Sequence, residues 1–469
     1  MSAIVTTKFR LENAASFINS VSSNSVYVGI GKSDKWSEAD IAPTPVDTIV
    51  EENDFWANAI AFKRVLAPNV TNIARRITWT SGSVYAAWND ADKDIFTKDF
   101  YVLNDSNNCV YKCIVAGAST SVNKPEHTTG PNPVFYGDGY AWQYMYALDS
   151  DLATKFLMTN YMPVKVATNA SGVTPTEQNN YDYQQSCLAG KGRIYRYVVT
   201  AGGSGYTVAP TVTVNGNGSG ASATAIVSGG QVTSVIVTGT NSGTTLQRST
   251  ALSSNAGADY TTVFITLSGG NGSGAAVSAV LSPGQGHGTD PVTELGGYYV
   301  GIRSLLTGAE GSGDFIVNNQ FRQIGVVKDP YVYDTTTVAT DNTLSSLYTL
   351  DLGTSITHAF TVGDTFTQIG GTGAGAVGIV DSFEKSTVNN HWYLKYHQND
   401  STGYKQFTDD STRIQSTNGT AEGEADIATN GVLPPEIQPY SGKVMFVESR
   451  APISRTASQI EDIRLILEF

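Results

Sequence analysis

The sequence predicts a multi-domain, mainly β protein with a few helices (α+β), in which a core of antiparallel sheets or a sandwich carries small inserted β modules. Glycine (47 residues) and tyrosine (24 residues) are plentiful, as are Ser, Thr and Val, which is typical of strands joined by many turns. Apolar residues recur at every second position in several segments, as half-buried strands require. A glycine motif also occurs twice, which indicates a repeated β unit. With 469 residues, the chain has room for about three domains.

Composition argues against nucleic acid and membrane as partners. The net charge is −13 at pH 7, and the adjacent basic pairs Lys63-Arg64 and Arg75-Arg76 are a weak signal. Because phosphate backbones require a basic face, we expect no nucleic-acid binding. Residues 1–8 lack the basic start and the apolar run of a secretory leader. No stretch approaches the roughly 20 apolar residues of a membrane helix, so we expect no membrane insertion.

The three cysteines do not form a disulfide framework, because their number is odd in a long chain. Cys109 and Cys113 share one face of a predicted strand but lie about 13 Å apart along it, too far for a bond. Cys187 is isolated in the sequence. We expect three free thiols, as in proteins made in the cytosol.

No sequence pattern requires catalysis or a bound metal. His391 and His397 share a predicted strand face at a separation of about 20 Å, too far for one metal ion. Asp90, Asp92 and Asp94 have alternate carboxylates but lack the glycine and the terminal glutamate of a calcium loop. Carboxylate pairs for glycoside hydrolysis stay open, because their separation is spatial rather than sequential. We therefore expect no catalytic residue, no metal and no cofactor.

The first segments of the chain mix helix and strand. Asn13–Val21 is predicted as a short amphipathic helix with Asn13 as its N-cap. Ser25–Gly31 follows as a strand with alternating apolar residues. A second helix is predicted over Asn53–Phe62, opened by an Asn or Asp cap. Residues 84–115 indicate two or three strands.

An aromatic strand follows the tight-turn dipeptide Asp138-Gly139. The alternation places a row of large rings on one strand face, and the row consists of Tyr140, Trp142, Tyr144 and Tyr146. Such rings pack in a core or in a protein interface, where Tyr and Trp are enriched. The alternative is a platform on which sugars or nucleobases stack.

Residues 191–300 contain an internal repeat. Tyr206–Val214 precedes Gly216–Ala221, and Tyr260–Leu267 precedes Gly270–Ala275, with 54 residues between matched positions. Each copy predicts a β-hairpin of a β-branched strand, a glycine turn and an Ala/Val strand, whose faces close when the copies stack. The glycine loops join strand to strand without a helix N-terminus or a following Gly-Lys-Ser/Thr, so we expect no phosphate site.

A second inserted β module is predicted over residues 340–432. Phe360–Ile369 indicates a pair of strands, and His391–His397 and Tyr404–Phe407 indicate further strands of a small barrel. Residues 416–430 are polar and typical of a linker or exposed loop.

The C-terminal segment is predicted to complete the core. Residues 442–448 alternate as a strand, which Arg450–Pro452 should end, because proline donates no ladder hydrogen bond. The last run predicts a half-buried strand, in which one face carries Ile463, Leu465, Leu467 and Phe469. A terminus with this pattern is normally tied into a sheet.

Several of these segments resemble the baseplate wedge proteins encoded by gene eight of T-even-like contractile-tailed phages. The resemblance covers about residues 1–165, 315–328 and 440–469, and the chain departs from the family between them. The matching motifs are Gly31–Trp36, Phe55-Trp56, Arg75–Trp79, Tyr136–Tyr146, Phe321–Val327, Glu448–Ile453 and Glu461–Phe469. The glycine repeat is similar to small β modules that decorate structural proteins of phages.

The resemblance implies a non-enzymatic structural protein of the virion, located in the tail baseplate after assembly in the host cytoplasm. It implies a homodimer that contacts other wedge proteins and takes part in baseplate assembly and in the triggering of contraction. It also implies a core built from residues 1–190, 301–339 and 433–469 around the two insertions. We expect the protein interfaces to include Trp36, Trp56, Tyr140, Trp142, Tyr144 and Arg450.

Two other functions stay open. One is a receptor-binding or carbohydrate-binding tail protein, in which the insertions contact surface glycans. The other is a tail-associated polysaccharide hydrolase, which would need two buried carboxylates facing one another in a groove.

Overall fold

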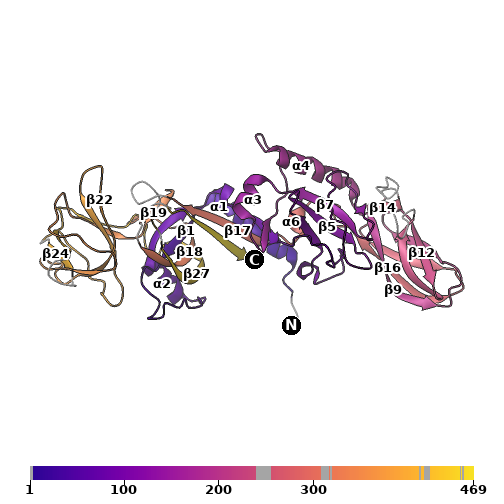
Figure 1. The fold of residues 1–469 in the computed structure, drawn as a ribbon, viewed down its shortest axis with the longest axis horizontal. Helices are drawn as coiled ribbons and strands as arrows, with labels where there is room; N and C mark the ends of the chain where they lie inside the picture. The colour runs from indigo at the N-terminus through magenta and orange to yellow at the C-terminus, as the bar shows by residue number, and fades with distance from the viewer. Residues whose placement is uncertain are drawn as a thin grey trace. The chain divides into compact units, whose positions relative to one another are not determined.

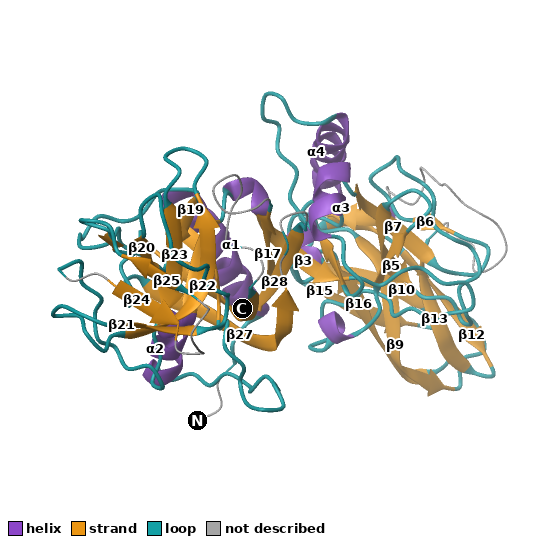
Figure 2. Ribbon diagram, turned by 60° about the vertical axis from the view of Figure 1, so that its left-hand side comes forward, coloured by secondary structure: helices purple, strands orange, loops and turns teal. Residues whose placement is uncertain are grey.

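The computed structural model describes residues 4–238, 255–307, 316, 319–410, 413–416, 423–454, 456 and 459–469. Strands predominate and helices are few (Figures 1 and 2). The ladders between the strands are antiparallel, so the predicted mainly β, α+β class is confirmed. The chain divides into two compact units: unit 1 comprises residues 1–16, 71–301 and 466–469, and unit 2 comprises residues 17–70 and 302–465.

The core of unit 2 is a five-stranded sheet. Its strands, in spatial order, are β19 (Thr343–Ser345), β2 (Ala59–Arg64), β1 (Val26–Gly31), β18 (Gln320–Lys328) and β27 (Lys443–Ser454). Helix α2 (Ile49–Asn58) packs on this sheet through Phe55 and Trp56. Gly29 and Gly325 face each other in the ladder, and a Cβ atom at Gly325 would lie 2.4 Å from the Phe55 ring. The paired glycines therefore leave room for the tip of this ring against the sheet.

Both predicted helices have different bounds in the structure. Helix α1 spans Thr7–Ser23, so Asn13 lies inside it, and the hydroxyl of Thr6 accepts from the backbone N–H of Phe9 at 3.3 Å instead. Helix α2 begins earlier than predicted, because Thr48 caps it by accepting from Glu51 N, and it ends at Asn58. Its last predicted residues form β2. A capping hydroxyl outside the apolar run sets the start in each case.

Pro452 does not end strand β27, contrary to the prediction. Strand β27 lies at the edge of the sheet, where a missing N–H costs no ladder bond. The register shifts between Phe321 and Gln323, which pair with Ile453 and Ser449. Arg450, Ala451 and Pro452 thus oppose Arg322 alone, which is a bulge. Edge position and bulge together accommodate the proline.

The segment predicted as the second insertion forms a seven-stranded sheet in unit 2. Its order is β25 (Glu424–Asp426), β24 (Arg413–Ser416), β21 (Thr365–Gln368), β22 (Val377–Lys385), β23 (Trp392–His397), β20 (Tyr348–Asp351) and β26 (Val432–Leu433). Phe360–Ile369 supplies one strand rather than a pair, and Tyr404–Phe407 lies in a loop. Phe407 is nevertheless buried in the core of this sheet, against Phe366 and Tyr396. Part of the predicted linker, Glu424–Asp426, pairs with β24.

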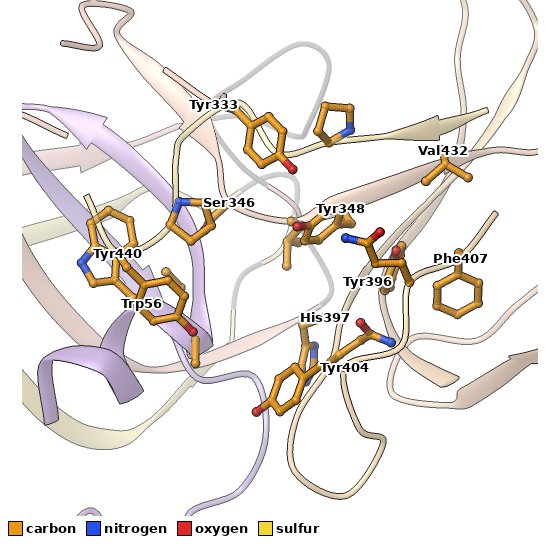
Figure 3. Close-up of a pocket in the computed structure, with 17 residues that line it drawn as sticks. Trp56, Tyr333, Ser346, Tyr348, Tyr396, His397, Tyr404, Phe407, Val432 and Tyr440 are labelled. Carbon is orange, nitrogen blue, oxygen red and sulfur yellow. The ribbon is translucent and has the colours of Figure 1, made fainter. Parts of the chain in front are cut away.

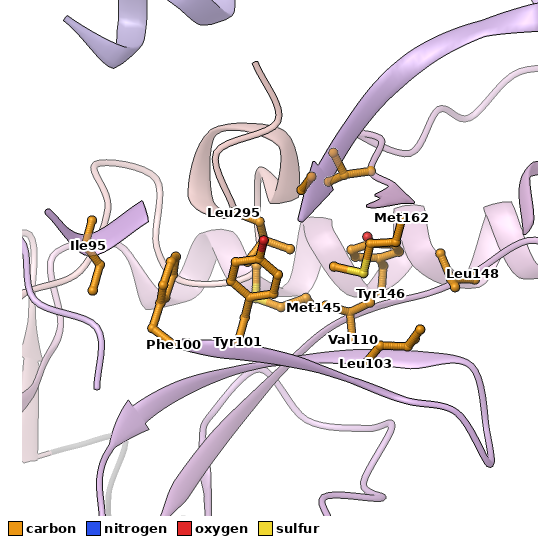
Figure 4. Close-up of a cluster of buried hydrophobic side chains, with 12 residues drawn as sticks. Ile95, Phe100, Tyr101, Leu103, Val110, Met145, Tyr146, Leu148, Met162 and Leu295 are labelled. Carbon is orange, nitrogen blue, oxygen red and sulfur yellow. The ribbon is translucent and has the colours of Figure 1, made fainter. Parts of the chain in front are cut away.

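Unit 1 is built around a four-stranded sheet and a large apolar core. The sheet order is β4 (Tyr101–Asn104), β5 (Cys109–Val115), β7 (Ala141–Ala147) and β6 (Val134–Phe135). Unit 1 also contains the helices α3 (Ser150–Phe156), α4 (Pro175–Cys187) and α6 (Pro291–Glu294). Figure 4 shows Phe100, Tyr101, Met145 and Leu295 converging in this core.

The C-terminal strand joins another sheet, as predicted. The sheet order is β28 (Glu461–Glu468), β17 (Tyr299–Leu306), β3 (Val70–Arg75) and β8 (Tyr161–Pro163). Ile463 and Leu465 are buried, whereas Leu467 and Phe469 are only half-buried. The apolar alternation therefore marks the strand, but its end lies closer to solvent than the pattern indicates.

The repeat in the first insertion is interlocked rather than hairpin-like, which corrects the prediction. The β-branched strand of the first copy is β10 (Thr211–Gly216), and that of the second copy is β15 (Val263–Ser268). These two strands pair with each other over six residues. Strand β11 (Ser219–Ala221) pairs with β14 (Ala256–Ala258), and β16 (Ser273–Leu281) pairs with β9 (Ile194–Ser204). Within copy one, a single residue pair joins β10 to β12 (Ala223–Ser228), whose main partner is β13 (Gln231–Val237). Each copy is thus completed by strands outside it.

The glycine motifs are packing surfaces for tyrosines of the other copy. A Cβ atom at Gly218 would lie 2.4 Å from the ring of Tyr260, and one at Gly272 would lie 2.5 Å from the ring of Tyr206. Asn217 fixes the contact by accepting from the backbone N–H groups of Thr261 and Thr262, both at 3.0 Å. Glycine is required here because no side chain fits beneath the ring.

Gly218→Ala is expected to destabilise the first insertion by about 1–3 kcal/mol, the usual cost of forcing an atom into a packed core. Hydrogen exchange of residues 194–237 and 256–281 would measure the loss of protection. Gly284→Ala is the matched control, because a Cβ atom there meets nothing within 4 Å. Equal protection in the two variants would show that the tyrosine contact does not hold the copies together.

Candidate functional site

Unit 2 contains a cavity of about 380 Å³ that is ringed by aromatic side chains (Figure 3). Trp56 reaches it from α2, Tyr348 from β20, and Tyr396 and His397 from β23. The other lining side chains with rings or polar groups are Tyr333, Ser346, Gln398, Tyr404, Gln406, Phe407, Pro434, Pro439 and Tyr440. Segments far apart in the sequence therefore build one aromatic site.

Two of these rings are held out towards solvent. Tyr404 and Tyr440 are each 60% exposed, whereas Trp56 and Tyr396 are buried. Tyr440 has a φ of +62°, a left-handed conformation that is rare for a bulky residue. The hydroxyl of Ser441 holds this turn by donating to Gln438 O at 2.7 Å and by accepting from Tyr331 N at 2.9 Å. The chain thus maintains a strained backbone at an exposed ring beside the cavity.

His397 forms a charge cluster at the wall of the cavity, in which Asp381 is buried and Asp34 is 30% exposed. Its Nδ1 lies 2.6 Å from Asp381 Oδ2, and its Nε2 lies 3.0 Å from Asp34 Oδ2. Burial alone would lower the pKa of His397, but the charge of Asp381 and the hydrogen bonds to both carboxylates raise the pKa to about 10. The same hydrogen bond lowers the pKa of Asp34 to about 2. The cluster is therefore an ion triad at neutral pH, with Asn399 donating to Asp34 at 2.7 Å.

His397→Gln is expected to lower the free energy of unfolding by about 2 kcal/mol at pH 6, the usual worth of hydrogen bonds to a charged group. A raised pKa makes this contribution complete below the ordinary value of 6.5 and removes it as the pH rises through about 10. Urea unfolding of both proteins from pH 6 to above pH 10 should therefore show a shrinking difference. His391→Gln is the control, because that side chain is 33% exposed and pairs with Asp351. A difference that does not change with pH would contradict the charged state of His397.

Unit 1 holds a second buried ion pair, between Lys112 of β5 and Glu294 of α6. Their side chains are 0% and 1% exposed, and the Lys112 ammonium lies 4.9 Å from the centre of the Trp88 ring. Glu294 also accepts from Gly288 N at 2.8 Å and from Asp290 N at 3.2 Å. Burial and the nearby Lys112 charge lower the pKa of His287 to about 4, so its imidazole is neutral at neutral pH. The pair pins α6, near the end of the predicted insertion of residues 191–300, onto the four-stranded sheet of unit 1.

The three cysteines lie in the core of unit 1, unpaired and buried. Burial raises the pKa of Cys109 and of Cys187 to about 11 and also raises the pKa of Cys113. The thiolate is the reactive form of cysteine, so these side chains are unsuited to nucleophilic chemistry.

Within the described residues, no group of three or more His, Cys, Asp or Glu side chains is placed to hold a metal ion. Asp92 of the predicted carboxylate run pairs with Lys98. No helix in the described part of the chain is long and apolar enough to cross a membrane.

Three of the residues expected at an interface lie in the core instead. Tyr140 and Trp142 are 0% exposed and Tyr144 is 5% exposed, and they pack with Tyr85 and Tyr183. Their row is shorter than predicted, because Val110 and Tyr111 pair with Tyr146 and Tyr144 and leave Met145 as a bulge. The bulge turns Tyr146 to the opposite face of the strand. These rings stabilise unit 1 and do not present a surface.

The other three expected residues lie in unit 2, and two of them meet. The indole N–H of Trp36 donates to the carbonyl of Arg450 at 3.3 Å, although 414 positions separate them. Both side chains are partly exposed. Trp56 lines the cavity. Sequence reasoning missed Tyr333, Tyr348, Tyr404 and Tyr440, for which the only signal is the large number of tyrosines.

Comparison with known proteins finds similarity to a phage protein family in the N-terminal part of the chain. Residues 3–123 match the family described as Bacteriophage T4, Gp8. The protein named "Baseplate wedge protein gp8" of Enterobacteria phage T4 is 24% identical in an alignment of 201 positions. The alignment covers 34% of this chain and 60% of that protein. The chain thus spans about 60% of the length of this curated relative. The resemblance inferred from the sequence motifs is confirmed for residues 3–123.

Proposed function

We propose that this chain is a non-enzymatic structural component of a phage tail baseplate wedge, located in the virion. The observation that carries the proposal is the match of residues 3–123 to the T4 Gp8 family. This match includes α1, β1, α2 and β2 as well as β3, β4 and β5, so it covers core elements of both units. The T4 relative is named a baseplate wedge protein, which supports a role as a structural component.

We propose further that the chain forms a homodimer, contacts other wedge proteins, and takes part in baseplate assembly and in the triggering of contraction. The Trp36–Arg450 contact and a neighbouring run of exposed apolar side chains support an interface in unit 2. The exposed fractions are 74%, 58%, 75% and 77% for Ile41, Val46, Ile49 and Val50. A segment with this many exposed apolar side chains is a candidate surface for binding another protein.

Light scattering after size exclusion tests the dimer. The expected mass is twice the 49.8 kDa of the chain, and Ile49→Asp with Val50→Asp should yield the monomer if this run lies in the dimer interface. Val388→Asp is the matched control, because Val388 is 94% exposed and lies in the second insertion. A monomer at every concentration of the unchanged protein would contradict the dimer.

We also propose the division of the chain into a core, from residues 1–190, 301–339 and 433–469, and two modules, from residues 191–300 and 340–432. The first module can be removed within the ladder of β9 and β16, where Val198 pairs with Ser278 and Val199 pairs with Val277. Replacing residues 200–276 by an Asn-Gly turn should close this ladder as a hairpin. The shortened protein should stay soluble and dimeric, whereas precipitation would make the module part of the core.

A role in carbohydrate binding is favoured by one observation, the aromatic cavity of unit 2, and we propose it as an addition to the structural role. The side chains that line the cavity include no Asp or Glu. Hydrolysis of a glycan requires a pair of carboxylates at the scissile bond, so we propose contact with a glycan and not its cleavage.

A further inference from the structure

The lining of the unit 2 cavity favours an uncharged ligand. None of its 17 lining residues is Lys, Arg, Asp or Glu. The one ionised group, His397, is already paired with Asp34 and Asp381. A charged ligand would therefore enter the cavity without a free counter-ion, which is costly away from water. An uncharged ligand meets no such cost.

The same lining offers both flat apolar faces and hydrogen-bonding groups. The amide N–H groups of Gln398 donate to Val377 O and Lys405 O, both at 2.7 Å, which fixes that side chain. The side chains of Gln406 and Ser346 have no hydrogen-bond partner among the described residues and lie at the cavity. Aromatic faces with a few placed polar groups are typical of sites for small ligands.

The exposed rings supply the second independent observation. Tyr440 is held at a φ of +62°, which is unfavourable for a residue with a side chain. Such strain persists where the surrounding structure demands it, and it is frequent at ligand sites. Together with Tyr404, it supplies two tyrosine side chains that are each 60% exposed at the same cavity. Tyrosine rings that only fill a core would instead be covered by neighbouring side chains.

A sugar fits these features better than an extended peptide does. A pyranose has one face of C–H groups, which packs on an aromatic ring, and an edge of hydroxyls, which binds amides and hydroxyls. A proline-rich peptide also binds aromatic grooves, but it extends by about 3.1 Å per residue and needs a long groove. A cavity of about 380 Å³ is compact and lies near the lower end of the ligand-pocket range of about 300–1,000 Å³.

We propose that this cavity binds a neutral hexose-containing glycan, with a sugar ring against Tyr404 and Tyr440 and its hydroxyls on Gln406 and Ser346. The inference rests on the carbohydrate-binding role proposed above and is independent of the wedge role. It assigns recognition to the junction of the second insertion with the unit 2 core sheet, and not to the glycine repeat.

The test is binding of the full chain to an array of neutral oligosaccharides of glucose, galactose, mannose and N-acetylglucosamine, followed by calorimetric titration of the best binder. Sialyllactose and decaproline are the charged and the peptide probes. We expect a neutral oligosaccharide to bind, and Tyr404→Ala to weaken binding at least tenfold while Tyr404→Phe retains it. Phe264→Ala, which removes a 64% exposed ring from unit 1, should leave binding unchanged.

Tyr440→Gly separates binding from folding. Glycine adopts a positive φ without strain, so this variant should keep or raise the thermal midpoint while binding falls at least tenfold. Binding that both tyrosine substitutions leave intact would overturn the proposal. So would an array without a neutral binder, or binding of sialyllactose or decaproline alone.

Failure of this inference is distinguishable from failure of the wedge role. A dimeric chain that is found in the baseplate but binds no neutral sugar would contradict the inference alone. A chain that binds a sugar through Tyr404 and Tyr440 but is absent from the baseplate would contradict the wedge role alone.

Discussion

Lys112→Ala is expected to lower the free energy of unfolding of unit 1 by about 3–5 kcal/mol, because it leaves the Glu294 carboxylate buried without a cation. Hydrogen exchange of residues 101–115 would report this loss without interference from unit 2. Lys98→Ala is the matched control: its pair with Asp92 is partly exposed, and such pairs contribute less than about 1 kcal/mol.

A double variant distinguishes a lost ion pair from a damaged core. Lys112→Met combined with Glu294→Gln removes both charges and keeps an acceptor for Gly288 N and Asp290 N. Replacing both members of a buried pair is often nearly neutral, so this protein should regain most of the protection that Lys112→Ala loses. A loss below 1 kcal/mol in the single variant would show that the pair does not pin unit 1.

Truncation after Asp462 is expected to yield a misfolded or protease-sensitive protein. It removes Ile463 and Leu465, each of which stabilises by about 1.5–3 kcal/mol when buried, from domains whose net stability is about 5–15 kcal/mol. It also exposes the edge of β17, which β28 covers. Limited proteolysis and thermal unfolding measure the effect.

Glu468→Gln is the control for this truncation. The pair of Glu468 with Arg10 has an N–O distance of 3.3 Å, and both side chains are well exposed, so its loss should change stability little. A truncated chain with the protease resistance and melting midpoint of the full chain would show that β28 is dispensable.

Local sequence patterns predict the strands in which the side chains of one face differ in polarity or size from those of the other. The alternation in β7 and β28 is visible in the sequence because side chains in a strand alternate between faces. The Met145 bulge is not visible, since it depends on the register of β7 against β5. The sequence predicts a strand end at Pro452, because neither the edge position of β27 nor its bulge is visible in the local pattern.

Most of the candidate site cannot be predicted from the sequence, because it also depends on which distant segments lie together. Tyr348, Tyr404 and Tyr440 come from separate segments, so no spacing connects them. The sequence shows the glycine repeat, whose copies are offset by 54 positions. It does not show that strands of the two copies pair with each other, because a hairpin within each copy is the simpler local interpretation. The Trp36–Arg450 contact joins two predicted residues whose proximity only the fold provides.

An electron cryo-microscopy map of the intact phage tail tests the wedge role most directly. We expect a dimer of this chain within each wedge of the baseplate, with Trp36 and the exposed residues from Ile41 to Val50 covered by neighbouring subunits. Density for the chain only in a tail fibre or in the sheath, or no density for it anywhere in the tail, would contradict the proposal.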